Sequence, residues 1–171
     1  WLRGQGLGVG DHIAILAENH PRYFEVYWAA LRSGIYLTAI NRYLAPEEAA
    51  YLVNDSGSVV LIASEALSAT AAGMLDLIPG CEHRLMMDGV VDGFESYEEA
   101  VAPMPTEKLA EEPAGDVMLY SSGTTGQPKG IRRPLSGLAI NDPSRTGIAM
   151  LERFLLGMDE NSVYLSPAPL Y

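Results

Sequence analysis

Short apolar runs alternate with longer segments of helical pattern over the first half of the chain, and this alternation constrains the fold most strongly. The runs cover residues 12–17, 35–40 and 59–63, and each is uncharged and close to turn-forming residues. Runs of this length predict strands that are covered on both faces. Because a helix fits between each run and the next, the strands are expected to pair in parallel through crossover helices. We therefore predict an α/β fold with a mainly parallel sheet, for which residues 83–87 are a candidate fourth strand.

The segments between the runs carry recognisable helix signals. The first helix is expected to begin near Pro21 and to end at Gly34, a residue suited to the left-handed conformation that closes many helices. Four large apolar residues recur on it at helical spacing, which predicts that they pack into the core. These residues are Phe24, Tyr27, Trp28 and Leu31. A second helix is expected from Pro46 to Gly57, and a third over residues 65–78.

The composition is that of a packed domain with an acidic surface. The chain has 171 residues, 48% of them hydrophobic, and a formal net charge of −11. This charge argues against a nucleic-acid partner, because a phosphate backbone would be repelled. The single cysteine, Cys81, excludes an internal disulfide and fits a cytoplasmic location. No apolar run approaches the roughly 18 residues that a transmembrane helix needs.

The second half of the chain begins with a segment that reads as a connector. Residues 88–114 are rich in acids and prolines, with one short helix expected around residues 96–101. Beyond it, residues 131–134 are expected to form a return strand, residues 143–156 a helix and residues 162–165 a strand.

The segment from Tyr120 to Gly130 reads Y-S-S-G-T-T-G-Q-P-K-G and follows a short apolar run that predicts a buried strand at residues 116–119. Glycines let backbone N–H groups approach a ligand, hydroxyls add donors, and Lys129 adds a positive charge. These groups together suit the phosphates of a nucleotide. The spacing is not that of the Walker loop, because a proline rather than a second glycine stands five residues after Gly123. A simple hairpin turn is the alternative interpretation, since the same residues favour turns.

Other reactive side chains form no recognisable centre in the sequence. The three histidines, His12, His20 and His83, lack the spacing of metal ligands, so no metal site is predicted. Nothing in the sequence brings a serine, a histidine and an aspartate together as a catalytic triad. Cys81 is interpreted as an inert, partly buried thiol. Arg132 and Arg133 suit either a bound phosphate or coenzyme A, or a solvated strand edge.

The string from Tyr120 to Gly130 closely resembles the phosphate-binding signature of the adenylate-forming superfamily, which includes acyl-CoA synthetases, adenylation domains of peptide synthetases and firefly luciferase. Residues 41–48 (N-R-Y-L-A-P-E-E) and the closing 166–171 (S-P-A-P-L-Y) are similar to two further segments of that superfamily. The resemblance implies that residues 1–171 are part of the large N-terminal AMP-binding domain, without the C-terminal lid. The start at Trp1 and the stop at Tyr171 within a motif agree with a piece of a longer chain.

The resemblance also implies a reaction in two steps. A carboxylic acid attacks the α-phosphate of Mg²⁺-bound ATP to form an acyl-adenylate, and a thiol, coenzyme A, then displaces AMP. Lys129 is implied as the catalytic residue and Tyr171 as part of the acid pocket. The implied nucleotide-binding residues are Ser121, Ser122, Gly123, Thr124, Thr125, Gly126, Gln127, Pro128, Lys129 and Gly130.

Three functions remain open at this point. The first is an acyl-CoA synthetase that activates a fatty or other hydrophobic acid, with the acid, ATP and coenzyme A as partners. The second is an amino-acid adenylation domain with a carrier-protein acceptor. The third is a non-catalytic nucleotide-binding or scaffold module. Under the first two, the 171 residues alone are expected to be inactive, because the resemblance assigns the adenine, ribose and lid contacts to segments beyond Tyr171.

Overall fold

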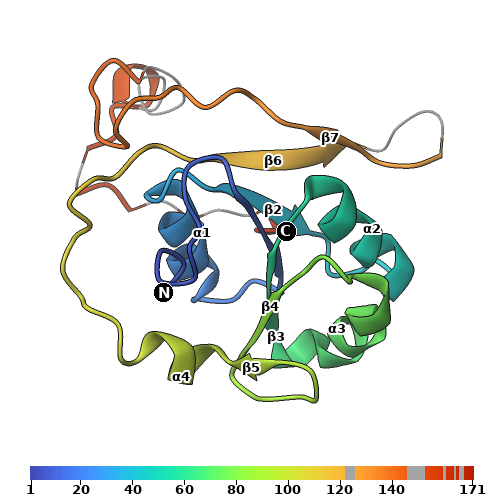
Figure 1. Cartoon of the computed structure of the whole chain (residues 1–171). Coiled ribbons are helices and arrows are strands. Elements are labelled where there is room, and N and C mark those ends of the chain that lie inside the picture. The colour runs from blue at the N-terminus through green and yellow to red at the C-terminus, as the bar shows by residue number, and fades with distance from the viewer. Residues whose placement is uncertain (122–125, 146–152, 160, 164, 166–167) are drawn as a thin grey trace.

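A seven-stranded sheet forms the centre of the molecule (Figure 1). The computed structural model describes residues 1–121, 126–145, 153–159, 161–163, 165 and 168–171. Within them the strand order is β5-β4-β3-β1-β2-β6-β7. The strands are β1 (His12–Leu16), β2 (Tyr36–Ile40), β3 (Val60–Ser64), β4 (His83–Met87), β5 (Glu95–Ser96), β6 (Asp116–Ser121) and β7 (Lys129–Ile131).

The strand pairing confirms the predicted α/β fold. All neighbouring strands from β5 to β6 pair in parallel, and only the last pair, β6 with β7, is antiparallel. At the centre, Ile13 of β1 lies opposite Leu37 of β2 on one side and Val60 of β3 on the other. The candidate fourth strand is present as β4, with the bounds that the sequence predicts. The short β5 was not predicted.

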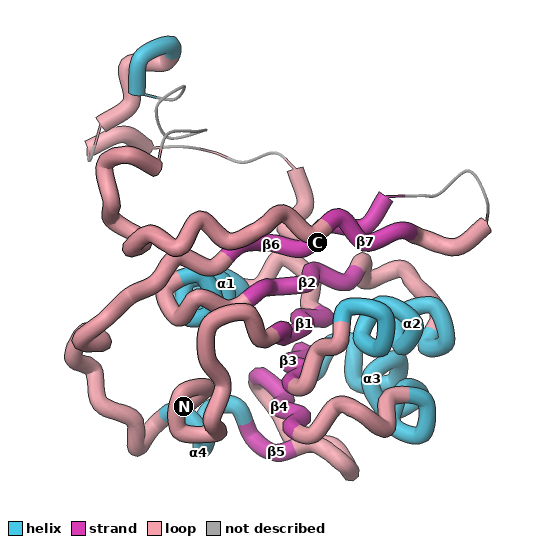
Figure 2. The backbone as a smooth tube through the Cα atoms, turned by 45° about the horizontal axis from the view of Figure 1, so that its top comes forward, coloured by secondary structure: helices cyan, strands magenta, loops and turns pink. Residues whose placement is uncertain are grey.

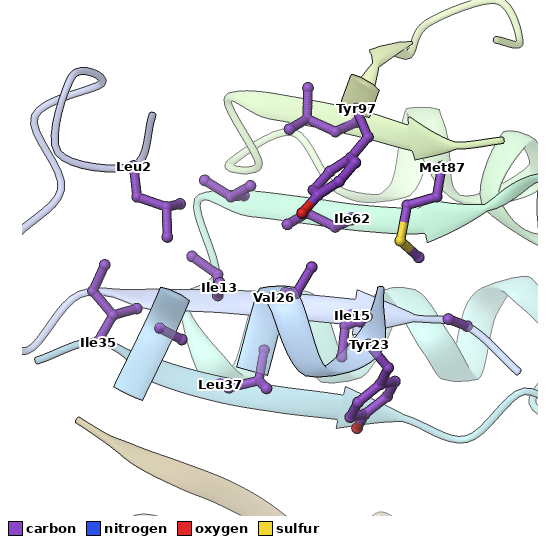
Figure 3. Packing of buried hydrophobic residues seen from close by; sticks show 14 of the residues in the cluster. Leu2, Ile13, Ile15, Tyr23, Val26, Ile35, Leu37, Ile62, Met87 and Tyr97 are labelled. Carbon is purple, nitrogen blue, oxygen red and sulfur yellow. The ribbon is translucent and has the colours of Figure 1, made fainter. Parts of the chain in front are cut away.

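Helices cover the two faces of the sheet in separate layers, as Figure 2 shows. One face carries α1 (Tyr23–Leu31) and α4 (Tyr97–Val101), whereas the other carries α2 (Pro46–Ser56) and α3 (Ser68–Met74). Alternate strand residues enter the two layers, so that Ile13 faces α1 and Ala14 faces α2. Figure 3 shows the layer beneath α1, where Val26 and Tyr23 meet Ile15 and Leu37.

Helix α1 presents a different face to the sheet from the predicted one. Its buried residues are Tyr23, Val26, Ala30 and Leu31. Phe24 and Trp28, by contrast, are 52% and 49% exposed, so the prediction that the whole aromatic stripe packs into the core is wrong. The buried set is also compatible with one helix face, at i, i+3, i+7 and i+8, and it shares only Leu31 with the predicted stripe. The backbone of α1 also lies close to the chain before β6, since a Cβ on Gly115 would be 2.9 Å from the Ala30 carbonyl oxygen.

The helices on the other face follow the predicted boundaries at their ends. Helix α2 begins at Pro46, where the carboxylate of Glu48 accepts a hydrogen bond from the Ala45 backbone N–H, and it ends at Gly57 with a φ of 69°. The single helix expected over residues 65–78 is instead three short pieces, η1 (Glu65–Leu67), α3 and η2 (Leu75–Leu77). Serine, threonine and glycine in this segment have weak helix preference, which agrees with the interruption.

Residues 88–114 run from β4, near one edge of the sheet, to β6, near the other. Helix α4 is the short helix expected in this segment, and the Ser96 hydroxyl caps it by accepting the Glu99 N–H at 3.2 Å. Gly115 is the residue directly before β6. Its N–H donates to the Leu31 carbonyl at 2.7 Å, and a Cβ on it would lie 2.2 Å from the backbone oxygen of Ile35.

The last part of the chain departs from the predictions in several places. β6 is a strand, but Met118 is its one buried residue and Leu119 is 56% exposed, so the prediction of a buried strand is wrong. The reason is that the described helices pack mainly over β1, β2 and β3. The return strand is Lys129–Ile131 rather than residues 131–134.

The helix and strand expected near the C-terminus are largely absent from the described residues. Residues 143–145 form a turn and 153–155 are helical, while 146–152 lie outside the described part of the chain. Residues 162, 163 and 165 are not in a strand, and Tyr164 lies outside the described residues. Within the described ranges, no helix has both the length and the apolar character needed to cross a membrane.

Gly115→Ala is expected to lower the free energy of unfolding by about 3 kcal/mol, because the new methyl group would collide with backbone atoms that cannot move aside. The matched control is Gly80→Ala, since nothing lies within 4 Å of a Cβ at that exposed glycine. The control is expected to stay within about 0.5 kcal/mol of the parent chain. Urea unfolding followed by circular dichroism measures both, and equal midpoints for the two variants would contradict the close approach at Gly115.

Candidate functional site

The carboxyl ends of the parallel strands meet at one edge of the sheet, where ligands commonly bind in open α/β folds. Glu18 and Asn19 follow β1 there, Asn41 and Arg42 follow β2, and β6 ends at Ser121. Segments distant in the sequence are therefore brought together at this edge. This edge is therefore the candidate ligand-binding region of the sheet.

The predicted phosphate loop is the connection of the β6–β7 hairpin. Leu119, Tyr120 and Ser121 pair with Ile131, Gly130 and Lys129 in an antiparallel ladder. The hairpin and the phosphate loop, treated as alternatives from the sequence, are thus compatible, because the hairpin forms the stem of the loop. Of the implied nucleotide-binding residues, Ser122, Gly123, Thr124 and Thr125 lie outside the described residues.

The described part of the loop contains a glycine in the left-handed region and an exposed lysine. Gly126 has a φ of 102°, a conformation that side-chain-bearing residues rarely adopt, so glycine is needed there. Gln127 and Lys129 are exposed. Within the described residues, no acidic side chain pairs with the Lys129 ammonium. Its charge is therefore available to an incoming anion.

Two tyrosines and an aspartate connect the stem of the loop to α2. The Tyr120 hydroxyl of β6 donates to Asp55 Oδ2 of α2 at 2.7 Å. The Tyr51 hydroxyl, one turn earlier on α2, donates to the Pro128 carbonyl at 3.1 Å and lies 3.4 Å from Asp55 Oδ1. Burial, reinforced by the bond to Asp55, raises the pKa of Tyr120, so its phenol keeps its proton at neutral pH and remains a donor.

Gly130 allows the return strand to lie close to the Tyr120 ring. A Cβ on Gly130 would be 2.3 Å from the Met118 methyl carbon and 3.1 Å from the Tyr120 ring. Of the predicted loop residues, Gly130 therefore has a packing role in the stem. The resemblance implies a nucleotide contact for Gly130, and this packing contact was not predicted.

Tyr171, the residue assigned to the acid pocket, lies at the same edge of the sheet. Its ring meets the Tyr43 ring edge to face at 6.0 Å, and the Arg42 guanidinium is 6.0 Å from its centre. The preceding residue is held by a hydrogen bond of 3.0 Å from the Leu170 N–H to the side chain of Asn19. The chain end is thereby placed beside the carboxyl ends of β1 and β2.

A cluster of polar side chains around the buried His20 lies at this edge and was not predicted from the sequence. The His20 Nδ1 accepts the Arg22 N–H at 3.1 Å, which leaves the proton on Nε2, and Nε2 donates to Asp88 at 2.7 Å. This bond, together with a contact from Arg22, lowers the pKa of Asp88. The cluster joins the start of α1 to the end of β4. No sequence spacing could reveal it, because its members are 68 residues apart.

Arg132 and Arg133 lie away from the loop, near the amino ends of the strands. Arg133 forms an ion pair of 2.8 Å with Asp116, the first residue of β6, and its carbonyl accepts the Tyr36 hydroxyl. The Arg132 guanidinium lies over the Tyr36 ring at 5.9 Å. Both arginines therefore belong to the solvated strand edge, the second of the two interpretations that the sequence left open.

The remaining candidates do not form a second reactive centre in the described residues. Cys81 is buried, which raises the pKa of its thiol to about 11 and agrees with the prediction of an inert thiol. No group of three or more histidine, cysteine or acidic residues is placed to hold a metal ion within the described part of the chain. A groove of about 410 Å³ lies between α1, α4 and residues 104–112, on the sheet face opposite α2.

Comparison with known proteins identifies relatives over the whole chain. The family model described as "AMP-binding enzyme" matches residues 1–171. A long-chain-fatty-acid–CoA ligase from Thermus thermophilus is 35% identical over 131 residues, which are 76% of this chain and 24% of that protein. A feruloyl-CoA synthase from an Amycolatopsis species is 31% identical over 162 residues, 91% of this chain and 30% of that protein.

Solved structures share the fold. An anthranilate–CoA ligase crystallised with anthranoyl-AMP superposes with a TM-score of 0.66 at 27% identity, over 76% of this chain and 26% of that one. A red-emitting luciferase from Phrixothrix hirtus shows the same fold with a TM-score of 0.64 at 23% identity, over 76% of this chain and 27% of that one. The chain spans about a quarter to a third of the length of the curated relatives. It belongs to the AMP-binding enzyme family, within the adenylate-forming superfamily that its loop resembles.

Proposed function

We propose that the protein carrying this chain is an ATP-dependent acid–thiol ligase that converts a carboxylic acid into its acyl-CoA. The observation that carries the proposal is the glycine- and hydroxyl-rich loop ending in Lys129, held at the ligand-binding edge of a sheet whose family is that of AMP-binding enzymes. The relatives' names as CoA ligases support the choice of coenzyme A as the thiol.

The proposed chemistry begins with activation of the acid. A carboxylate oxygen of the acid attacks the α-phosphorus of ATP, and the bond from that phosphorus to the bridging oxygen of pyrophosphate breaks. The products are an acyl-adenylate and pyrophosphate. The sulfur of coenzyme A then attacks the acyl carbon, its proton is lost, and AMP departs. Each step accumulates negative charge on phosphate oxygens, which fixed donors and a cation stabilise.

We assign the phosphate contacts to residues 121–130. The N–H and hydroxyl groups from Ser121 to Gly126 would bind the β- and γ-phosphates, and Lys129 would neutralise the pyrophosphate as it leaves. Magnesium would enter as the Mg²⁺ complex of ATP, since Mg²⁺ in such sites is held largely by substrate phosphates and water. Tyr171, beside Arg42 and Tyr43, would line the acid pocket.

We further propose a fatty or other hydrophobic acid as the substrate. The named relatives act on long-chain fatty acids and on ferulate, acids with large apolar parts. A cytoplasmic location is also proposed, which the buried free thiol of Cys81 supports. Residues 1–171 would then be part of an AMP-binding domain in which 88–114 is an internal connector.

Lys129→Ala is expected to lower acid-dependent ATP–pyrophosphate exchange about a hundredfold, because a charge that stabilises the departing phosphates is removed. The exposed lysine should contribute little to stability, so the melting temperature is expected to change little. The chain offers a matched control in Lys108→Ala, which removes the other lysine, exposed on the connector. Exchange that is equal in the two variants would remove Lys129 from the mechanism.

The choice of acid gives a second prediction for the protein that carries this chain. Pyrophosphate exchange is expected with long-chain and aromatic acids and not with the twenty amino acids, because the proposed pocket is formed partly by aromatic rings. A panel of both classes at equal concentration, each with and without coenzyme A, measures the preference. Exchange with one amino acid alone, unaffected by coenzyme A, would favour the amino-acid adenylation domain.

A further inference from the structure

The hydrogen bonds at the stem of the phosphate loop point to a role for α2, and the argument rests on the proposed function. We propose that Tyr51 and Asp55 of α2, together with Tyr120 of β6, are positioning residues that hold the loop in place for the phosphates of ATP. We call these three residues the stem clamp. None of them is among the residues proposed to contact the nucleotide, so each would affect ATP binding only by positioning the loop.

The stem clamp holds both sides of the loop. On the outgoing strand, the Tyr120 hydroxyl donates to Asp55 at 2.7 Å. On the return side, the Tyr51 hydroxyl donates at 3.1 Å to the carbonyl of Pro128, the residue directly before Lys129. The two bonds therefore bracket the segment from Ser121 to Gln127.

Helix α2 is a rigid support for these bonds. Its buried face packs against the sheet through Ala49, Ala50, Leu52, Val53 and Ser56. Tyr51 and Asp55 are not in that face: they are half-buried and exposed, respectively, and lie one helical turn apart. Because they project from the helix beside its buried face, their side-chain oxygens reach the hairpin, while the Tyr51 ring also packs against the edge of the core. The hairpin thus takes its position from an element that is itself fixed against the sheet.

The contacts around Gly130 strengthen the same coupling. The Tyr120 ring lies so close to Gly130 that a Cβ there would approach it to 3.1 Å. Tyr120 thereby binds α2 through its hydroxyl and the return strand through its ring. A shift of α2 or of Tyr120 must move the backbone next to Lys129. Since displacements of about 1 Å in a positioned group can reduce a rate a hundredfold, small changes here should be measurable.

The test compares three variants of the stem clamp in the protein that carries this chain. They are Tyr51→Phe, Asp55→Ala and Tyr120→Phe, of which the two phenylalanine variants keep the ring and remove only the hydroxyl. The matched control is Tyr97→Phe, because the Tyr97 hydroxyl also donates to a carboxylate, Glu25 Oε2 at 3.1 Å, but on the opposite face of the sheet. Asp55→Asn tests for rescue, since its amide oxygen can still accept the Tyr120 hydroxyl.

The first readout is the KM for each substrate in the pyrophosphate exchange reaction. The stem-clamp variants are expected to raise the KM for Mg-ATP about tenfold and to leave the KM for the acid unchanged. Asp55→Asn should restore most of the loss seen in Asp55→Ala. A merely structural role would lower the amount of active protein and leave both KM values as they were. Tyr97→Phe is expected to do no more than that.

The second readout does not depend on activity. Trypsin cleavage after Lys129, followed by mass spectrometry, reports on the return side of the loop, with cleavage after Lys108 in the connector as an internal standard. Tyr51→Phe is expected to accelerate cleavage after Lys129 several-fold relative to Lys108. Saturating Mg-ATP should slow this cleavage in the parent protein.

A third comparison links the stem clamp to Lys129. If Tyr51 acts by positioning Lys129, Tyr51→Phe should have little further effect in a Lys129→Ala background. An unchanged KM for Mg-ATP in all three stem-clamp variants overturns the positioning role. If Lys129→Ala lowers exchange in that case, the proposed function stands and only this inference fails. If Lys129→Ala has no effect either, the assignment of the loop fails with it.

Discussion

The parallel pairing of β1 with β2 and β3 is the constraint on which the rest of the structure depends. All five residues of β1 are buried, so both of its faces must be covered by other elements. Parallel neighbours cannot be joined by tight turns, so each connection crosses the sheet as a helix, with α1 on one face and α2 and α3 on the other. The same pairing brings the carboxyl ends of the strands to one edge, where the candidate site lies.

The position of the predicted phosphate loop depends on this arrangement indirectly, through β6 and β7. β6 joins the sheet beside β2, and Gly115 allows the chain to approach α1 closely enough to enter that place. The hairpin with β7 then carries the loop, while Tyr51 and Asp55 connect its stem to the helix that covers the opposite face. In the proposed function, the loop sequence would supply donors and charge, and the stem would hold them at the carboxyl edge of the sheet.

Features encoded by local sequence were predictable, and features that depend on long-range packing were not. The strands His12–Leu16 and Val60–Ser64, the start of α2 at Pro46 and the left-handed Gly34 all follow from apolar runs, capping and glycine. The buried face of α1 did not, because two overlapping sets of apolar residues on it both fit a helical period. The choice between them is made by tertiary packing, in which Tyr23, Val26, Ala30 and Leu31 lie against residues of β1 and β2.

The site shows the same division. The loop could be predicted from its residues, but the hydrogen bonds that connect its stem to α2 could not. The bond from Tyr120 to Asp55 spans 65 residues and that from Tyr51 to Pro128 spans 77. The His20–Asp88 pair was hidden for the same reason. The burial of β6 was overestimated because an apolar run indicates a strand without indicating which helices cover it.

Hydrogen–deuterium exchange with and without Mg-ATP tests the central claim most directly, because it reports where the nucleotide phosphates bind. In the protein that carries this chain, slower exchange is expected in peptides covering residues 121–130, and Lys129→Ala should weaken it. Inorganic pyrophosphate with Mg²⁺ should protect the same peptides, since the claim concerns phosphates and not the base. Protection confined to the groove between α1 and α4, with residues 121–130 unchanged, would contradict the account.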